Sequence, residues 1–208
     1  KLYNLCRIRE ELTVRLVSPS KDVYIKGYCS NISTPPNQNP LVTQITIVCP
    51  DPYFKSISGG FVQMYGDSDC WEWINNGTEF NAVELGNIKN AAITTIEYGG
   101  ETETGFEISV HCHGSCDGFR LKNIKNGSLL GFDASMKAGD LFKISTKKGC
   151  KTAYIERNGV IIDCMKDMAE GSSFLQLSPG ENKLKITVGA DAQFVSVFCK
   201  FDELFGGF

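Results

Sequence analysis

Apolar and polar residues alternate with a period of two in many short segments, which is typical of half-buried β-strands. The clearest segment is 107–113. In a strand there, one face would carry Ile108, Val110 and Cys112, and the other would carry Ser109, His111 and His113. Similar segments are 61–65, 92–98, 121–125, 129–133, 141–146, 183–188 and 195–201. Strands that recur at short intervals, with turn residues between them, predict an all-β fold, an antiparallel β-sandwich.

Three Asn-Gly dipeptides mark turns between these segments: Asn76-Gly77, Asn126-Gly127 and Asn158-Gly159. Asn-Gly suits the type I′ turn, because both of its central residues need a positive φ. Strand-forming residues flank the last dipeptide at 152–157 and 160–164, which predicts a tight β-hairpin. The only helical candidate is short, near Met165–Glu170.

The chain divides near residue 58 into two predicted parts. In the first part, Leu12, Val14 and Leu16 alternate with polar residues, and the segment 44–49 places three apolar residues on one face. The Pro-rich stretch 33–40 is predicted to be an exposed arm. Residues 1–58 hold three or four strands, which is marginal for independent folding. We therefore expect either the closing part of a β domain or a segment that packs on the second part. Residues 59–208 are expected to form the sandwich.

Composition limits the classes of partner. The 208 residues carry a net charge of −3, and no block of Lys and Arg forms a nucleic-acid-binding patch. No apolar run approaches the roughly 18 residues of a membrane helix. The nine cysteines are odd in number, so they cannot all pair within one chain. We expect reduced core residues, with Cys49, Cys112 and Cys199 at inward positions, in preference to a disulfide framework.

One segment has the residue types of a metal site: His111, His113 and Cys116 lie close together in the sequence. Zinc needs four convergent nitrogen or sulfur ligands, whereas the strand pattern points Cys112 into the core and offers no fourth ligand. We therefore interpret the two histidines as surface residues beside a core cysteine. No Gly-x-Ser-x-Gly motif and no phosphate-binding glycine loop are present, so no cofactor and no catalytic site are predicted.

A second candidate is the aromatic and acidic segment around Trp71 and Trp73. Carboxylates beside tryptophans are found in glycosidase clefts and on sugar-binding faces. The alternative is an exposed acidic loop whose aromatic residues meet a partner subunit, and we prefer this interpretation. Trp71 and Trp73 are thus candidate contacts for carbohydrate or for a partner protein.

Several stretches resemble the distal tail protein family of siphophages, in the order in which that family has them. The stretches are GYCSNISTPPNQNPLVTQITIVCPDPYF at 27–54, GGETETGFEISVHCHG at 99–114, AGDLFKISTKKGCKTAYIERNGVIID at 138–163, SSFLQLSPGENKLKI at 172–186 and FDELFGGF at 201–208. The His-Cys-His and Trp-Glu-Trp motifs do not belong to the family pattern.

The resemblance implies a galectin-like sandwich preceded by part of an N-terminal β domain whose first half lies outside this sequence. It also implies a structural protein of the virion tail, made in the host cytoplasm, that joins the tail tube to the baseplate or adhesion device. In that family the N-terminal domain builds a ring, commonly a hexamer, and the partners are other copies, tail-tube proteins and baseplate or tail-fibre proteins. Galectin-like describes the topology only, so no sugar-binding residue is transferred.

Two alternatives remain open at the level of sequence. The first is a carbohydrate-binding β-sandwich module, based on Trp71 and Trp73. The second is a metal-binding enzyme, based on His111, Cys112, His113 and Cys116. The expected function is structural and not enzymatic, with neither nucleic acid nor membrane as a partner.

Overall fold

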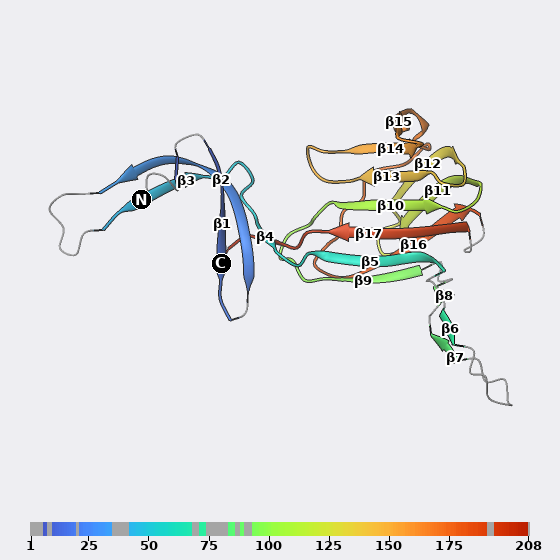
Figure 1. The fold of residues 1–208 in the computed structure, drawn as a ribbon, viewed down its shortest axis with the longest axis horizontal. Helices are drawn as coiled ribbons and strands as arrows, with labels where there is room; N and C mark the ends of the chain where they lie inside the picture. Colours follow the sequence, from blue (N-terminus) through green and yellow to red (C-terminus); the bar gives the residue numbers. More distant parts are fainter. Residues whose placement is uncertain are drawn as a thin grey trace. The chain divides into compact units, whose positions relative to one another are not determined.

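The structure of the protein is a computed structural model (Figure 1) that describes residues 6–7, 10–19, 21–34, 42–67, 71–73, 83–85, 88–89, 93–190 and 194–207. Between residues 66 and 92 it describes only the backbone. The contacts divide the chain into two compact units, Lys1–Gly59 with Glu203–Phe208, and Gly60–Asp202. Every strand pair in the described part of the chain is antiparallel, which confirms the predicted all-β class.

The first unit is a five-stranded sheet around one long central strand, β2. Its strands are β1 (Glu11–Val17), β2 (Asp22–Ser33), β3 (Gln44–Val48), β4 (Phe54–Ser56) and β18 (Leu204–Phe205). Tyr28 of β2 pairs with Glu11 of β1 and with Val48 of β3, so β1 and β3 lie on opposite sides of β2. The expected alternation is observed, because Leu12, Val14 and Leu16 are half-buried between exposed neighbours.

The last strand joins this first sheet and not the sandwich. Leu204 pairs with Lys55 and Phe205 pairs with Phe54, which brings Glu203–Phe208 into the first unit. The predicted sandwich range 59–208 therefore ends too late. A two-residue strand has too few positions to show a period, and only the pairing reveals where it belongs.

The second unit is a two-layer sandwich. Its larger sheet has the order β15-β14-β13-β10-β17-β5-β8, and its smaller sheet has the order β12-β11-β16-β9. The strands are β5 (Gly60–Asp67), β8 (Ile88–Lys89), β9 (Ile93–Tyr98), β10 (Phe106–Cys112), β11 (Cys116–Asn123), β12 (Leu129–Met136), β13 (Leu141–Ser145), β14 (Thr152–Arg157), β15 (Val160–Asp163), β16 (Gly180–Gly189) and β17 (Val195–Phe201). Two further strands, β6 (Trp71–Trp73) and β7 (Val83–Leu85), pair with each other.

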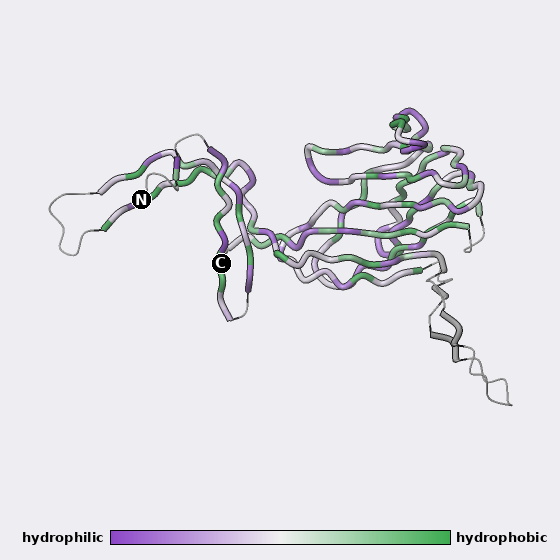
Figure 2. The backbone as a smooth tube through the Cα atoms, viewed as in Figure 1, coloured by the Kyte–Doolittle hydropathy of each residue, from purple (hydrophilic) through white to green (hydrophobic). Residues whose placement is uncertain are grey.

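The core lies between the two sheets and contains the residues that the alternation pointed inward. Hydrophobic and hydrophilic residues alternate along the sandwich strands (Figure 2). Ile108, Val110 and Cys112 of β10 are buried, while His111 is exposed. At the centre, Phe142 of the larger sheet meets the ring edges of Phe119 and Phe132 of the smaller sheet. The ring centroids lie 6.4 Å and 5.5 Å apart. This packing joins the two layers.

The hairpin predicted at Asn158-Gly159 is confirmed. Strands β14 and β15 flank the dipeptide, and both residues have a positive φ, 51° and 78°. Asn126-Gly127 differs, because only Gly127 has a positive φ and the turn is held by Asn side chains that accept backbone N–H bonds. Asn76-Gly77 lies outside the described residues.

The expected helix near 165–170 is reduced to one 3-10 turn, η1 (Met165–Asp167), after which Met168 is extended. None of the described helices is long and apolar enough to cross a membrane.

Every cysteine in the described part of the chain is free. Cys112 and Cys199 are buried as expected, while Cys49 is half-buried. Burial raises the pKa of Cys199 to about 12, so this thiol is neutral and behaves as a small apolar core residue.

Candidate functional site

The two histidines lie at one end of β10 on the outer face of the larger sheet. The His111 ring meets the Phe198 ring edge-on, with centroids 5.3 Å apart, and His113 Nε2 lies 3.3 Å from the hydroxyl oxygen of Ser196. Partial burial, followed by the charges of His113 and Lys143, lowers the pKa of His111. His111 is therefore mostly neutral at pH 7 and acts as an aromatic surface residue.

The structure does not bring Cys116 to these histidines. Cys116 is buried at the start of β11, in the opposite sheet, and its thiol lies 3.8 Å from the carbonyl oxygen of Gly118. Residues 113–115 cross from one sheet to the other, so proximity in sequence does not become convergence in space. Among the described residues, no three His, Cys, Asp or Glu side chains are placed to hold a metal ion.

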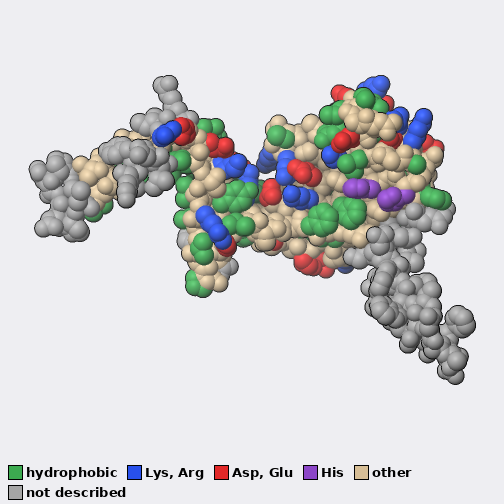
Figure 3. Space-filling view, viewed as in Figure 1, with side chains coloured by type: hydrophobic (Ala, Val, Ile, Leu, Met, Phe, Trp, Pro, Cys, Tyr) green, Lys and Arg blue, Asp and Glu red, His purple; other side chains and the backbone are tan. Residues whose placement is uncertain are grey.

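An outer aromatic patch, defined as Phe61, Phe198 and His111, spans three adjacent strands of the larger sheet. Phe61 is 68% exposed, and its ring stacks on Phe198 at 5.6 Å with an interplanar angle of 16°. Apolar side chains lie beside the two histidines on this face (Figure 3). Because exposed aromatic residues are enriched at protein interfaces, this patch is a candidate contact surface.

Phe61 and Phe198 were not among the candidate residues that the sequence indicated. Alternation contains part of the signal, since the inward positions Val197 and Cys199 leave Phe198 facing outward. The stack itself depends on the pairing of β17 with β5, which places Phe198 opposite Gln63 and Lys200 opposite Phe61. Local periodicity does not give that register.

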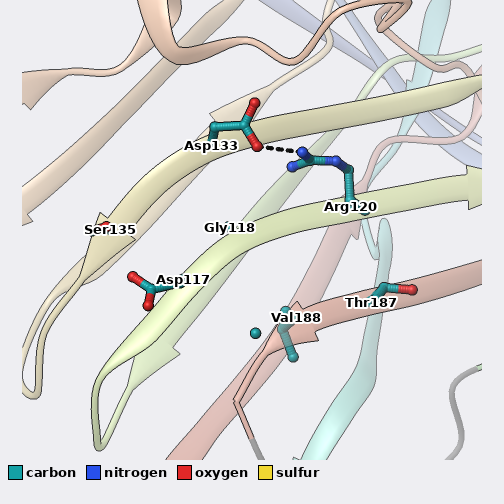
Figure 4. Close-up of a pocket in the computed structure, with 8 residues that line it drawn as sticks. Asp117, Gly118, Arg120, Asp133, Ser135, Thr187 and Val188 are labelled. Carbon is teal, nitrogen blue, oxygen red and sulfur yellow. Dashed lines mark hydrogen bonds and ion pairs between the residues drawn. The ribbon is translucent and has the colours of Figure 1, made fainter.

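A shallow depression of about 380 Å³ lies on the smaller sheet (Figure 4). It is lined by Asp117, Gly118, Arg120, Asp133, Ser135, Thr187, Val188 and Gly189. A β-bulge between Asp117 and Phe119 shapes it, with Gly118 at φ 73°. At Gly189, a Cβ atom would lie 2.1 Å from the carbonyl oxygen of Asp117, so the close approach of β16 to the bulge requires glycine.

Two of the charged residues in this depression, Arg120 and Asp133, are paired with each other. Arg120 donates to the carbonyl oxygen of Phe132 at 2.8 Å and forms an ion pair with Asp133. Its side chain lies over Gly131, where a Cβ would come within 2.4 Å of Arg120 Cδ. Arg120 is thus held along the strands as a structural residue of the sheet surface.

Trp71 and Trp73 lie on β6, which pairs with β7, and their side chains fall outside the described residues. The side chains of the acidic residues near them also lie outside the described residues, and so do residues 35–40 of the predicted arm. The proposed role of Trp71 and Trp73 therefore remains a prediction.

Taken together, the fold and its surfaces define an antiparallel β-sandwich protein whose candidate sites are exposed faces and strand edges. Residues 99–204 match the family described as siphovirus-type tail component, C-terminal domain. The chain belongs to this family of structural phage tail components, as its sequence motifs predicted.

The solved structures include similar folds. One is the crystal structure of the SPP1 Dit protein, described as a paradigm of the hub adsorption apparatus in phages that infect Gram-positive bacteria. The match covers 95% of this chain and 67% of the SPP1 Dit chain. The identity is 13% and the TM-score is 0.62, which shows a shared fold. Structures of the phage P2 baseplate in its activated conformation, with calcium and with strontium, cover 92% of this chain and 67% of theirs. Their identities are 8% and 11%, and their TM-scores 0.48 and 0.47. No curated protein matches the chain.

Proposed function

We propose that the protein is a distal tail hub that joins the tail tube to the baseplate or adhesion device of a siphovirus-type phage. The observation that carries this proposal is the family match over residues 99–204. The fold shared with SPP1 Dit, a protein described as a hub, supports it over nearly the whole chain.

The hub role implies further properties. The protein works without catalysis, it resides in the virion tail, and it is made in the cytoplasm of the host. Its partners are other copies of itself, tail-tube proteins and baseplate or tail-fibre proteins, with no nucleic acid or membrane involved. The candidate contact surfaces described above fit this role, because a hub works through exposed surfaces.

The first unit offers an edge for a ring contact. Strand β1 pairs with β2 on one side only, and its other side is free of strands among the described residues. The N–H of Ser18 donates a hydrogen bond to the carbonyl of Lys21, so this pair is a hydrogen-bonded position of the antiparallel ladder. Hydrogen-bonded and non-hydrogen-bonded positions alternate along β1. Thr13, Arg15 and Val17 are therefore not bonded to β2, and their N–H groups point outward. A strand of a neighbouring copy can extend such an edge. When the two contacting surfaces differ, repetition of this contact closes a ring if the rotation between copies permits.

We expect Thr13→Pro to prevent ring formation in the longest natural form of the chain. Proline removes the outward N–H of Thr13 and leaves the bonds to β2 intact, since proline is tolerated on the open side of an edge strand. Native mass spectrometry should show a ring, which we propose to be hexameric, for the natural chain and a monomer for the variant.

Thr13→Ala is the matched control, and it should keep the ring. A natural chain that remains monomeric at all concentrations would count against the hub, as would immunogold label on virions anywhere but the distal tail. An intact ring in Thr13→Pro would reject only the β1 edge as the contact.

We also propose that the β6–β7 pair contacts a neighbouring tail protein through Trp71 and Trp73, with carbohydrate as the alternative ligand. The Trp71→Ala/Trp73→Ala double variant should lose binding to isolated tail complexes in pull-down experiments. Glycan-array binding that disappears in the same variant would favour carbohydrate, and unchanged behaviour in both assays would contradict any contact role.

A further inference from the structure

Strand β15 is an edge strand that exposes apolar side chains on both of its faces. Val160 is 61% exposed, Ile161 69% and Ile162 37%. Edge strands in soluble proteins are usually protected by lysine, proline or a bulge. Residues 160–163 contain neither lysine nor proline, and their pairing with β14 has no register shift. An uninterrupted Val-Ile-Ile run is typical of a strand that is buried on both of its faces.

The backbone of Ile161 is also available for pairing. Cys164 N–H bonds to the carbonyl of Ala153 at 2.9 Å, and Arg157 pairs with Val160 across the two-residue turn. In an antiparallel pair, hydrogen-bonded and non-hydrogen-bonded positions alternate, so Val160 and Ile162 bond to β14. Ile161 therefore points its N–H and C=O groups away from the sheet, where a further strand can bind them.

The edge is complementary to itself about Ile161. If a second copy runs antiparallel with Ile161 opposite Ile161 of that copy, Val160 meets Ile162 and Ile162 meets Val160. The two Ile161 residues then exchange both backbone hydrogen bonds. Each contact across the seam is thus apolar against apolar.

The charges do not oppose this register. The only ionisable residue of β15 is Asp163, and it would lie opposite the uncharged Gly159 of the other copy. On β14, Glu156 lies opposite Ile161, and its carboxylate forms an ion pair with the Lys143 Nζ at 3.1 Å. In this register, no like charges lie opposite each other between the two β15 strands, so charge repulsion does not prevent their pairing.

We propose that β15 is a self-pairing edge through which two copies of the protein join their larger sheets into one continuous sheet. The contact is isologous, so it makes dimers and does not build rings, and it goes beyond the proposed hub function. Three apolar residues per copy bury less than the roughly 1,000 Å² of a stable interface, so the dimer is weak and depends on concentration.

Sedimentation equilibrium tests this proposal between about 10 µM and about 1 mM, the range of weak protein contacts. Across this range a monomeric chain should double its mass, and a ring, which carries one β15 edge per copy, should associate to at least twice its mass. Ile161→Lys places two like charges at the two-fold axis and should abolish the doubling. Ile124→Lys, at a 45% exposed isoleucine in the β11–β12 turn, is the matched control and should preserve it.

Cross-linking tests the register directly. Ile161→Cys in a Cys150→Ser background should form an intermolecular disulfide under mild oxidation by dissolved oxygen, because antiparallel partners place their Cα atoms about 5.5 Å apart. Ile124→Cys in the same background should not. Absence of the Ile161 cross-link, or a mass doubling that survives Ile161→Lys, would overturn the proposal, whether or not the hub ring forms.

Discussion

Replacing Phe142 by alanine is expected to lower the free energy of unfolding by about 3–5 kcal/mol. Phe142 has no exposed surface, and it contacts the edges of Phe119 and Phe132 across the two layers. The variant loses the transfer free energy of the ring and leaves a cavity between two rigid sheets, which relax only partly.

Urea denaturation followed by far-UV circular dichroism measures this effect. Phe142→Leu should lower the free energy of unfolding by less than Phe142→Ala does, because leucine fills part of the cavity. Phe198 lies on the outer face of the same sheet and is only partly buried. Phe198→Ala should therefore lower the free energy of unfolding markedly less than Phe142→Ala. Equal losses for Phe142→Ala and Phe198→Ala would contradict the assignment of the core to the space between the two sheets.

Replacing Asp140 by alanine should lower the free energy of unfolding by about 2–4 kcal/mol, just below the range for a fully buried ion pair because Arg157 is partly exposed. The Asp140 side chain is 1% exposed, whereas that of Arg157 is 30% exposed. Asp140 accepts hydrogen bonds from the Arg157 guanidinium and from the Lys137 N–H at 2.8 Å. Its loss leaves these donors without their acceptor and frees the turn between β12 and β13.

The same carboxylate predicts a dependence on pH. Hydrogen bonds from Arg157, and then from the Lys137 N–H, hold the pKa of Asp140 below its usual value. A lowered folded pKa means that this stabilisation is fully present above the unfolded pKa of about 4 and is lost as the pH falls through the folded value. The difference in unfolding free energy between the natural chain and Asp140→Asn should therefore shrink below about pH 4. A difference that is constant from pH 7 to pH 3 would contradict this role.

Local pattern was sufficient for the strands and their faces. Alternation placed Ile108, Val110 and Cys112 inward because a strand with one buried face repeats every two residues. Asn158-Gly159 defined its hairpin because type I′ geometry needs two positive φ angles. Both features depend on only a few consecutive residues.

Long-range pairing was not predictable in the same way. Strand β10 lies between β13 and β17, and β11 lies between β12 and β16, which requires contacts between segments distant in the sequence. The outer aromatic patch depends on such pairings, since β17 must lie between β10 and β5 to bring His111, Phe198 and Phe61 together. For the same reason, the closeness of His113 and Cys116 in the sequence suggested a shared site that the crossing between sheets separates.

Strand β18 has a consequence for synthesis on the ribosome. Its partner β4 leaves the ribosome before any strand of the sandwich, whereas β18 follows all of them. Because domains generally fold as units during translation, the sandwich is expected to be complete before the small sheet receives its final strand. Until that moment, β4 has an unpaired side that chaperones or nascent neighbours can reach.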